Sequence, residues 1–410
     1  MKGAVTRSPL RQRSRAGTDP GKKLVPASSR SPSAPAFPFS VPSARPRTMI
    51  QSAPERVLRR LDTAARQHPY ALRNHQMRKH ADMARKLQLT LCCGDYEIVR
   101  ALKEGAVEAD GIELTMVTSP DSTTRHWRFL RNREFDVAEV SSSSYIIARD
   151  QNMPFDAIPV FLHRRLRHGF AFVNTSKGIK EPKDLIGKKV GVKSFQVTAV
   201  LWLRGILEEH YGVPHRSIEW VTELDEDVDF DPPPGLNLTK MREDQNCEDM
   251  LVSGELDAVL HPDLIWPMTE KHPSVGRLWP DYKAEERRYW DKTGIFPIMH
   301  VMGIKREIVE KYPWAPIELY KAFDKAKAIA MRRMENPRIV PLVWYRESWE
   351  EQEEIFGTDP WEYGLTEQNR KNLDTLVGYS HAHGLIKRPI PLEELFLDVG
   401  QGRKRGHDRI

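Results

Sequence analysis

Short apolar stretches alternate with amphipathic ones along most of the chain from residue 87 onward. The apolar stretches are bounded by glycine, proline or charged residues, and they predict β-strands at residues 87–91, 112–117, 136–140, 157–161, 169–174, 187–192, 218–221, 254–260 and 298–304. Stretches with helical periodicity predict helices at about 96–104, 121–132, 142–150, 198–211 and 248–253, and helices predominate from residue 315 to residue 400. Strands that alternate with helices indicate an α/β protein with largely parallel sheets.

Two of the predicted strands share a local pattern, in which an acidic turn leads into the strand and polar residues follow it. The first is Arg133–Glu139, which continues into the serine run 141–144, and the second is Gly254–Leu260, which continues into His261. In open α/β sheets, ligands bind beyond the carboxyl ends of the strands. Two such units about 120 residues apart therefore predict two similar lobes that face one cleft, as in a two-lobed small-molecule binder.

The predicted strands also divide the chain. Residues 87–187 are expected to form the first part of lobe 1, residues 188–297 lobe 2, and residues 298–410 a return to lobe 1 with C-terminal helices. Residues 1–48 hold eight prolines and eight serines and predict a disordered extension. An organelle transit peptide and an over-extended gene start are alternative interpretations of that segment. Residues 49–86 look like a polar, mostly helical lead-in.

Composition narrows the class of partner. The chain has 63 basic and 57 acidic residues, but ten of the basic and one of the acidic residues lie within residues 1–48, which leaves the rest near neutral. A nucleic-acid partner is therefore not expected. No stretch approaches the roughly 18 apolar residues of a membrane helix, and no apolar secretory region begins the chain. Three cysteines make no disulfide framework, so a cytoplasmic protein without a membrane partner is expected.

A basic loop separates two of the predicted strands. Residues 163–168 contain Arg164, Arg165 and Arg167 together with two histidines. A guanidinium can grip a carboxylate through two hydrogen bonds, and such charge-assisted bonds are worth about 1.5–3 kcal/mol each. The loop therefore predicts a clamp for a carboxylate or phosphate group, with an ordinary solvated basic loop as the alternative.

Hydroxyl groups gather where two strands turn into helices. Their hydroxyls and the free backbone N–H groups there can hold an anion, although ordinary helix capping is the alternative. The ligand contacts expected in these regions and after the first strand are Ser143, Ser144, Tyr145, Ser194, Thr198 and Asp95. Tyr145 is included because its ring can stack on an aromatic ligand, although core packing is its other interpretation.

Histidines are the candidates for proton transfer, because their pKa lies near neutrality. His300 lies in an apolar strand expected along the hinge, His261 follows the second acidic turn, and His168 ends the basic loop. Each is also open to interpretation as a buried core residue. His261 and His383 have neighbours that superficially resemble metal ligands, but no distant partners complete a site, so no metal is expected.

Several motifs together resemble one family, the 4,5-dihydroxyphthalate decarboxylases. The resemblance covers about residues 87–397 and rests on residues 91–96, 133–137, 142–145, 158–161, 167–168, 191–192, 204–207, 254–258, 297–300, 312–314 and 359–364. It implies the type II periplasmic-binding-protein fold in a cytoplasmic protein. The family's catalytic residues are not carried over, so the candidates above are chemical inference from this sequence.

The resemblance implies an aromatic acid decarboxylase that converts 4,5-dihydroxyphthalate to protocatechuate and CO2. A base that takes the para phenol proton and an acid that protonates the ring suffice, so no cofactor is expected. The runner-up is a non-catalytic protein that binds an aromatic acid. A thiamine-pyrimidine synthase is disfavoured because Cys92-Cys93 matches that group's cysteine-rich motif poorly. The expected partner is a small aromatic carboxylate, and the exact acid and any homo-oligomer stay open.

Overall fold

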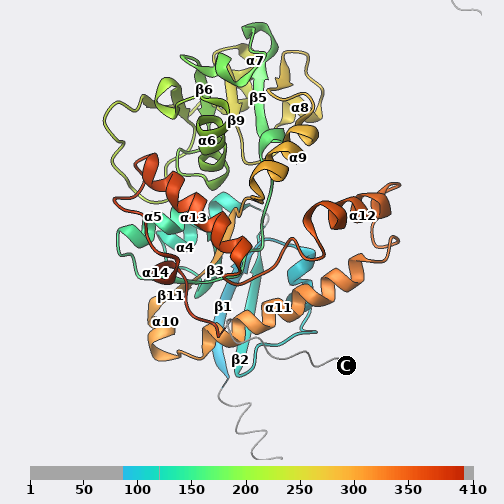
Figure 1. Ribbon diagram of the computed structural model, residues 1–410. Helices are drawn as coiled ribbons and strands as arrows, with labels where there is room; N and C mark the ends of the chain where they lie inside the picture. Colours follow the sequence, from blue (N-terminus) through green and yellow to red (C-terminus); the bar gives the residue numbers. More distant parts are fainter. Residues whose placement is uncertain (1–85, 120, 401–410) are drawn as a thin grey trace, which may run out of the picture. The chain divides into compact units, whose positions relative to one another are not determined.

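Two β-sheets organise the residues that the structure describes, which are 86–119 and 121–400 of a computed structural model (Figure 1). These residues all belong to the unit Arg73–Ile410. The expectations for residues 1–48 and for the lead-in up to residue 85 lie outside the described residues. Among the helices described, none is long and apolar enough to cross a membrane.

The first sheet has the strand order β2-β1-β3-β11-β4, and the part of the chain around it is called lobe 1 below. Its strands are β1 (Leu87–Cys93), β2 (Ile112–Thr118), β3 (Val137–Ser141), β4 (Phe155–Ile158) and β11 (His300–Lys305). Strands β1, β2 and β3 are mutually parallel, whereas β11 runs antiparallel to both β3 and β4. All five residues of β3 are buried, because this strand lies at the centre of the sheet.

The second sheet has the order β10-β5-β9-β6-β7-β8 and defines lobe 2. Its strands are β5 (Ala171–Asn174), β6 (Lys189–Val192), β7 (Glu219–Thr222), β8 (Leu238–Lys240), β9 (Ala258–Leu260) and β10 (Val275–Arg277). Strands β6 to β9 are parallel, and β5 is antiparallel to β9 and β10. Sequence reasoning missed β8 and β10, which are three-residue edge strands without a clear apolar alternation.

The boundary expected at residue 188 is wrong, because β5 already belongs to lobe 2. Strand β5 was expected to stay with the strands before it, but its hydrogen bonds go to β9 and β10, which come some 85 to 100 residues later. A strand's own sequence does not say which sheet it will join when its partners are distant. Strand β11, which follows residue 298, pairs with β3 in lobe 1.

Two antiparallel segments connect the lobes. One contains the basic loop 163–168 and the other precedes β11. They are joined where the Arg165 N–H donates to the Pro297 carbonyl at 3.1 Å and the Met299 N–H donates to the His163 carbonyl at 2.9 Å. The basic loop is therefore not a solvated excursion but one of the two connections between the lobes.

Helices cover both faces of each sheet. In lobe 1 these are α3 (Arg100–Lys103), α4 (Ser122–Leu130), α5 (Ser142–Asp150), α10 (Arg306–Lys311) and α11 (Ala315–Met334). In lobe 2 they are α6 (Thr198–Tyr211), α7 (Cys247–Ser253), α8 (Trp266–Thr269) and α9 (Tyr282–Thr293), of which α8 and α9 were not predicted. Helix α11 packs on α3, while α5 packs on β3 and β11 on the opposite face.

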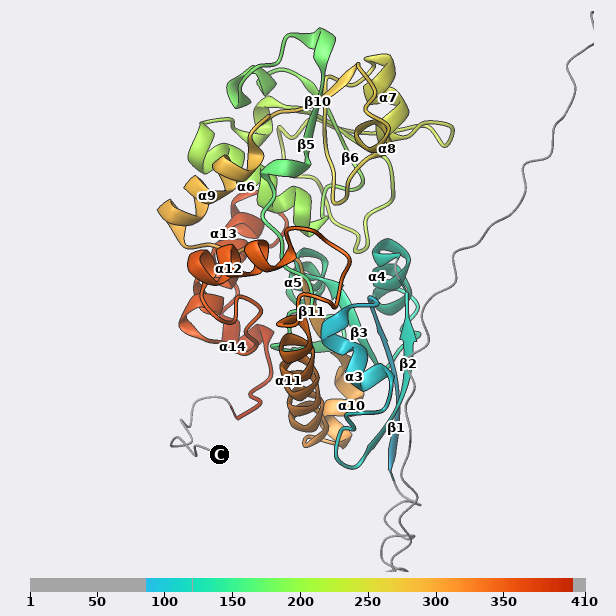
Figure 2. The same ribbon diagram turned by 90° about the vertical axis from the view of Figure 1, so that its right-hand side faces the viewer.

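The C-terminal helices α12 (Tyr345–Phe356), α13 (Glu367–Ala382) and α14 (Leu392–Leu395) follow α11. In Figure 2, α12 and α13 lie at the level between the two sheets. Helix α13 contacts both α5 of lobe 1 and α6 of lobe 2, and one cluster of buried residues runs through both lobes and α13. Gly205 permits this contact, because a Cβ there would lie 2.2 Å from the Tyr379 ring of α13.

Candidate active site

A cavity of about 830 Å³ lies between the lobes, a volume in the usual range of small-molecule sites. Lobe 1 contributes residues that follow β1 and β3 together with His300 at the start of β11, and lobe 2 contributes the start of α6 and the residues after β9. Apolar and aromatic walls come from Leu162, Val197, Met299, Met331, Trp349 and Trp361. The cavity thus lies where the two repeated strand-end patterns were expected to meet.

His300 and Glu139 form the buried pair at the lobe 1 side of this cavity. In the β11–β3 register His300 lies opposite Ser141, so Glu139 is its diagonal neighbour on the same face of the sheet. The His300 Nδ1 is 2.6 Å from Glu139 Oε1, and the Arg125 guanidinium is 2.9 Å from Glu139 Oε2. Because Nδ1 is engaged by the carboxylate, Nε2 is the ring nitrogen left for a ligand.

Glu139 is fully buried, yet its surroundings keep it ionised. Burial alone would raise its pKa, but the charge and hydrogen bond of His300 and the charge of Arg125 hold the pKa well below its ordinary value. The Gly94 N–H donates to Oε2 at 2.7 Å and the Tyr96 hydroxyl donates to Oε1 at 2.8 Å. A carboxylate held in this way fixes the orientation of the His300 ring.

Two further imidazoles flank His300. The His126 and His163 rings lie edge-on to it, with centroid distances of 4.7 and 4.8 Å, and both line the cavity. Burial and then the charge of His300 keep the pKa of each well below its ordinary value. Both rings are therefore neutral at pH 7 and shape the pocket around His300 without adding charge.

Arg167 is fully buried and forms no ion pair with any described carboxylate. Its Nη2 donates to the carbonyls of His261 and Pro262 at 2.7 and 2.9 Å, while Nε and Nη1 have no hydrogen-bond partner among the described residues. Burial, followed by the charge of Arg165, lowers its pKa to about 9, so it stays charged at pH 7. A buried cation with unused donors beside a cavity is suited to bind an anionic ligand group.

The other two arginines of the loop differ in role. Arg164 lines the cavity, but its Nη2 donates to the Glu362 carbonyl at 2.6 Å and to Asn369 Oδ1 at 2.7 Å, so it anchors the C-terminal segment. Arg165 also lines the cavity and is exposed. The three arginines predicted as a clamp therefore divide into a buried donor, an anchor and an exposed cation.

The hydroxyl groups at the two helix starts mainly join the lobes. Thr198 Oγ1 is 2.8 Å from Ser141 Oγ and accepts a hydrogen bond from the Ser143 N–H at 3.0 Å. The Ser144 hydroxyl donates to Asp227 at 2.8 Å. Thr198 and Ser194 line the cavity, whereas Ser143 and Ser144 do not. The hydroxyl cluster is used chiefly for contact between lobe 1 and lobe 2.

Besides Ser143 and Ser144, three further residues expected at the site do not line the cavity. Tyr145 does not line the cavity, because its ring packs in the core and its hydroxyl donates to the Leu395 carbonyl. His261 is also outside the lining, with its ring turned back so that Nδ1 is 2.8 Å from the Asp263 carbonyl. His168 is buried against Trp279 and two tyrosines. Burial lowers the pKa of His261 to about 4 and that of His168 to about 3.

Asp95 does line the cavity, but it is exposed and its carboxylate is 2.8 Å from Lys103 Nζ. Sequence reasoning also missed the residues that surround His300, namely Glu139, Arg125, His126 and His163. A signal for Glu139 exists, because a carboxylate in the middle of a strand buried on both faces must have a charged partner. The identity of that partner is set by the distant strand β11.

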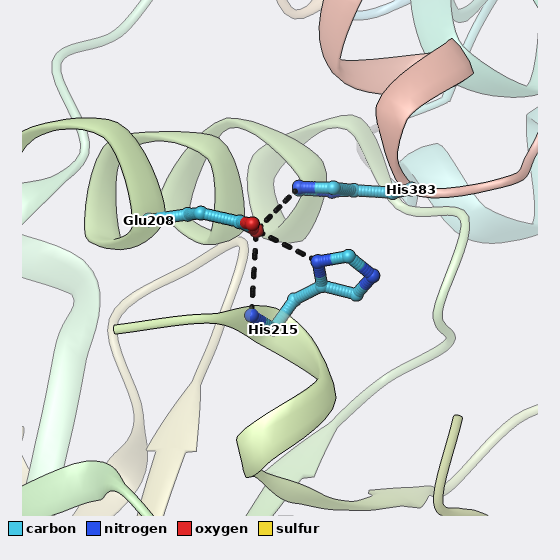
Figure 3. A group of neighbouring side chains, drawn as sticks. All are labelled: Glu208, His215 and His383. Carbon is cyan, nitrogen blue, oxygen red and sulfur yellow. Dashed lines mark hydrogen bonds and ion pairs between the residues drawn. The ribbon is translucent and has the colours of Figure 1, made fainter. Parts of the chain in front are cut away.

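The described residues also bring together one group of metal-ligand types outside the cavity. Figure 3 shows Glu208 of α6, His215 of the 3-10 helix His215–Ser217 and His383 at the end of α13 pointing toward one another. Their potential ligand atoms all lie within 4.8 Å of one another. Two imidazoles and a carboxylate are ligands that Zn²⁺ accepts.

The hydrogen bonds of this group fit a metal poorly. Arg204 Nε donates to His383 Nδ1 at 3.4 Å, so the proton of the neutral ring belongs on Nε2, which is 3.2 Å from Glu208 Oε2. A histidine that binds a metal normally donates its second N–H to an acceptor, but here the second nitrogen faces a donor. His215 Nδ1 also bonds Glu208 Oε2, at 2.7 Å. The group is better explained as a hydrogen-bonded link between α6 and the end of α13.

The fold and the cavity define a two-lobed protein of the type II periplasmic-binding-protein class, with its ligand site between the lobes. A family model described as NMT1/THI5 like matches residues 97–224. The 4,5-dihydroxyphthalate decarboxylase of Comamonas testosteroni is 33% identical over 321 residues, which cover 76% of this chain and 96% of that protein. The chain therefore belongs to the 4,5-dihydroxyphthalate decarboxylase family.

Other similarities are more distant or shorter. The 4,5-dihydroxyphthalate decarboxylase of Pseudomonas putida is 33% identical over 204 residues, covering 48% of this chain and 78% of that protein. Among solved structures, the periplasmic aliphatic sulphonate binding protein of Escherichia coli is 12% identical with a TM-score of 0.47, covering 76% of this chain and 97% of that chain. A desulfurization enzyme is 15% identical with a TM-score of 0.41, covering 76% and 96%. Membership in the family supports a decarboxylase activity.

Proposed function

We propose that this protein decarboxylates a hydroxylated aromatic dicarboxylate, with 4,5-dihydroxyphthalate as the substrate and protocatechuate and CO2 as the products. The observation that carries the proposal is the buried Arg167, whose unused donors lie beside the same cavity as the His300–Glu139 pair. The relatives named as 4,5-dihydroxyphthalate decarboxylases support the choice of acid.

Arg167 holds the carboxylate that the product retains. Charge-assisted hydrogen bonds from its Nε and Nη1 replace the solvation that the carboxylate loses in the cavity. Exposed Arg165 adds positive charge to the lining of the same cavity. The apolar walls formed by Leu162, Met299 and Trp361 pack on the aromatic ring.

His300 acts as the general base. With Nδ1 bonded to Glu139, its Nε2 takes the proton of the phenol that is para to the departing carboxylate. The phenolate pushes electron density to the carbon that bears this carboxylate, and the charge of Glu139 stabilises the imidazolium that forms. The ring itself serves as the electron sink, so this route uses no organic cofactor.

The test is CO2 release from 4,5-dihydroxyphthalate by the purified full chain, measured with and without a chelator. Turnover in both conditions is expected. Arg167→Ala should raise KM by roughly 10- to 100-fold, the equivalent of about 1.5–3 kcal/mol for a lost charge-assisted interaction. Arg388→Ala is the matched control, because this exposed arginine pairs with Glu394 at the surface and does not line the cavity.

Two results would contradict the proposal. Thermal stabilisation by the acid without CO2 release would mean a binding protein that uses the same cavity. Turnover with an unchanged KM in Arg167→Ala would mean that the retained carboxylate is bound elsewhere.

A further inference from the structure

A loop of lobe 2 reaches across to lobe 1 beside the cavity. It follows β7, and its residues 226–229 are joined to lobe 1 by Arg131, which comes directly after α4. The Arg131 guanidinium donates to the Glu226 carbonyl at 2.6 Å and to the Asp227 carbonyl at 3.1 Å, and it pairs with Asp229 at 3.0 Å. Three oxygen atoms of the loop thus accept from the Arg131 guanidinium. The Gln151 side chain donates to a fourth, the Asp229 carbonyl, at 2.6 Å, so two side chains of lobe 1 hold the loop.

Asp227 is the residue that this loop places at the cavity. Its Oδ2 accepts a hydrogen bond from the Ser144 hydroxyl at 2.8 Å, and it belongs to no ion pair among the described residues. Asp225, two residues earlier, lines the same cavity but is exposed and pairs with Lys240. The two carboxyl groups therefore meet opposite environments within one short loop.

These environments move the two pKa values apart. Burial raises the pKa of the Asp227 carboxyl, and it outweighs the lowering by the Ser144 hydroxyl and by the charges of Arg131 and His300. The hydrogen bond and charge of Lys240 lower the pKa of Asp225. A carboxyl group whose pKa is raised keeps its proton to higher pH, as a general acid must, and Asp227 is the one of the two that also sits beside Ser144 of lobe 1.

We infer that Asp227 is the general acid, an assignment that rests on the proposed function. Asp227 delivers its proton to the ring carbon that loses CO2. Arg167 and Arg165 are assigned to the substrate carboxylate, His300 is the base, and His126 and His163 are neutral walls of the pocket. Asp227 faces the cavity from lobe 2, whereas His300 faces it from lobe 1.

His300 takes the proton of the phenol. Asp227 gives its proton to the ring carbon that bears the departing carboxylate. That carbon becomes tetrahedral, and the ring becomes a dienone. The C–C bond to the carboxylate then breaks, its electron pair restores the aromatic ring, and CO2 leaves. The phenolate recovers its proton from His300, and Asp227 is reprotonated from water, so one proton replaces one CO2.

This assignment makes the site dependent on the contact between the loop and lobe 1. The acid and the base come from different lobes, so they face one substrate only while the loop is held by Arg131 and Ser144. Closure of the loop would also keep bulk water from the ring carbon while the proton is transferred.

The test compares wild type, Asp227→Asn and the control Asp231→Asn, an exposed residue of the same loop. Asp227→Asn should lower kcat by about 10²- to 10⁴-fold with little change in KM, as expected for loss of a general acid, and Asp231→Asn should match wild type. A structural role of Asp227 would instead raise KM and lower the melting temperature.

A second readout isolates proton transfer to carbon. By microscopic reversibility, the wild-type protein in D2O that contains bicarbonate as a source of CO2 should exchange the hydrogen of protocatechuate at the carbon that had carried the lost carboxylate, as seen by NMR. CO2 must add to this carbon before the hydrogen can leave it. Asp227→Asn should not catalyse the exchange, and neither should wild type without CO2. In Ser144→Ala, loss of a hydrogen bond to the carboxylate should raise the Asp227 pKa and move the alkaline limb of the kcat profile to higher pH.

The outcomes separate the two proposals. If the wild-type protein releases CO2 and Asp227→Asn keeps the full kcat and the full ring exchange, the assignment of Asp227 is overturned. The proposed function would still stand. A wild-type protein that neither releases CO2 nor exchanges the ring hydrogen overturns both.

Discussion

Two carboxylates in this protein each bind imidazole nitrogens, and their surroundings differ sharply. Glu139 is fully buried in the central strand β3, contacts Arg125 and His300, and has a cavity on the other side of the imidazole. Glu208 is on helix α6 with its side chain 42% exposed, and it joins His215 and His383 of neighbouring segments.

The comparison teaches that the residue types alone do not define a catalytic group. At Glu139 the imidazole of His300 lines the cavity, whereas at Glu208 both imidazoles link α6 to neighbouring segments and neither lines the cavity. A carboxylate–imidazole pair becomes a catalytic candidate where the ring also faces a cavity with a binding group such as Arg167. The predictions below test this distinction.

The largest effect is expected for His300→Ala. Loss of the general base should lower kcat by about 10²- to 10⁴-fold, with a much smaller effect on the melting temperature. Steady-state CO2 release and thermal unfolding of the same preparation would measure both. His383→Ala is the control from the other cluster, and equal losses of kcat in the two variants would remove the distinction between the clusters.

Next in size is the effect of Glu139→Gln on stability. The substitution leaves Arg125 buried without its carboxylate, and breaking a buried pair in this way costs about 3–5 kcal/mol of unfolding free energy. Chemical denaturation would measure it. Glu208→Gln is the matched control, and it should cost less because the Glu208 side chain is partly in water. A smaller loss in Glu139→Gln than in Glu208→Gln would contradict the electrostatic account of the site.

A smaller effect is expected when the Glu208 cluster is broken directly. His383→Ala leaves hydrogen-bonding groups of Arg204 and Glu208 without this partner and should lower the unfolding free energy by about 1–3 kcal/mol, while kcat stays at the wild-type value. The addition of Zn²⁺ or a chelator should leave the wild-type melting temperature unchanged. A rise with Zn²⁺ that is absent in His383→Ala would show instead that the cluster binds metal.

The smallest effect concerns pH. Burial, followed by the charges of Arg204 and His215, lowers the pKa of His383 from 6.5 to about 2. The folded state therefore favours the neutral ring, so this contribution to stability is complete above pH 6.5 and is lost as the pH falls from 6.5 toward 2. Between pH 7 and pH 5, the unfolding free energy should decrease less with falling pH in His383→Ala than in wild type. Chemical denaturation at several pH values would measure this, and an equal pH dependence in the two proteins would contradict it.

Much of the fold could be predicted from local pattern. The alternation of apolar and polar residues located nine strands, because a buried strand needs a continuous or alternating apolar stretch whatever its partners are. Sequence pattern did not predict the edge strands β8 and β10, because each has only three residues. It also did not predict helix α9, because most of its residues are polar and only Tyr289 is buried. The assignment of β5 to lobe 1 failed because pairing with β9 and β10 is not encoded in its own four residues.

The candidate site was predictable only in part, for the same reason. Arg167, His300, Ser194 and Thr198 were expected from strand ends and charge clusters, and the structure places all four at the cavity. Their roles are still proposals.

His168 was also a candidate by sequence, after His300 and His261, yet it is packed among aromatic rings and does not line the cavity. The direction in which a histidine points depends on what packs around it, and that information lies elsewhere in the chain.

The sequence by itself determined the α/β class, the two repeated strand-end patterns and the family, because these depend on periodicity and on local motifs. Only the tertiary structure decided that Glu139 orients His300, that Arg164 is an anchor while Arg167 keeps free donors, and that Asp227 of lobe 2 lines the same cavity as His300 of lobe 1. Each of these depends on contacts between residues far apart in the chain. Burial then gives like residues unlike pKa values, and no local pattern reports it.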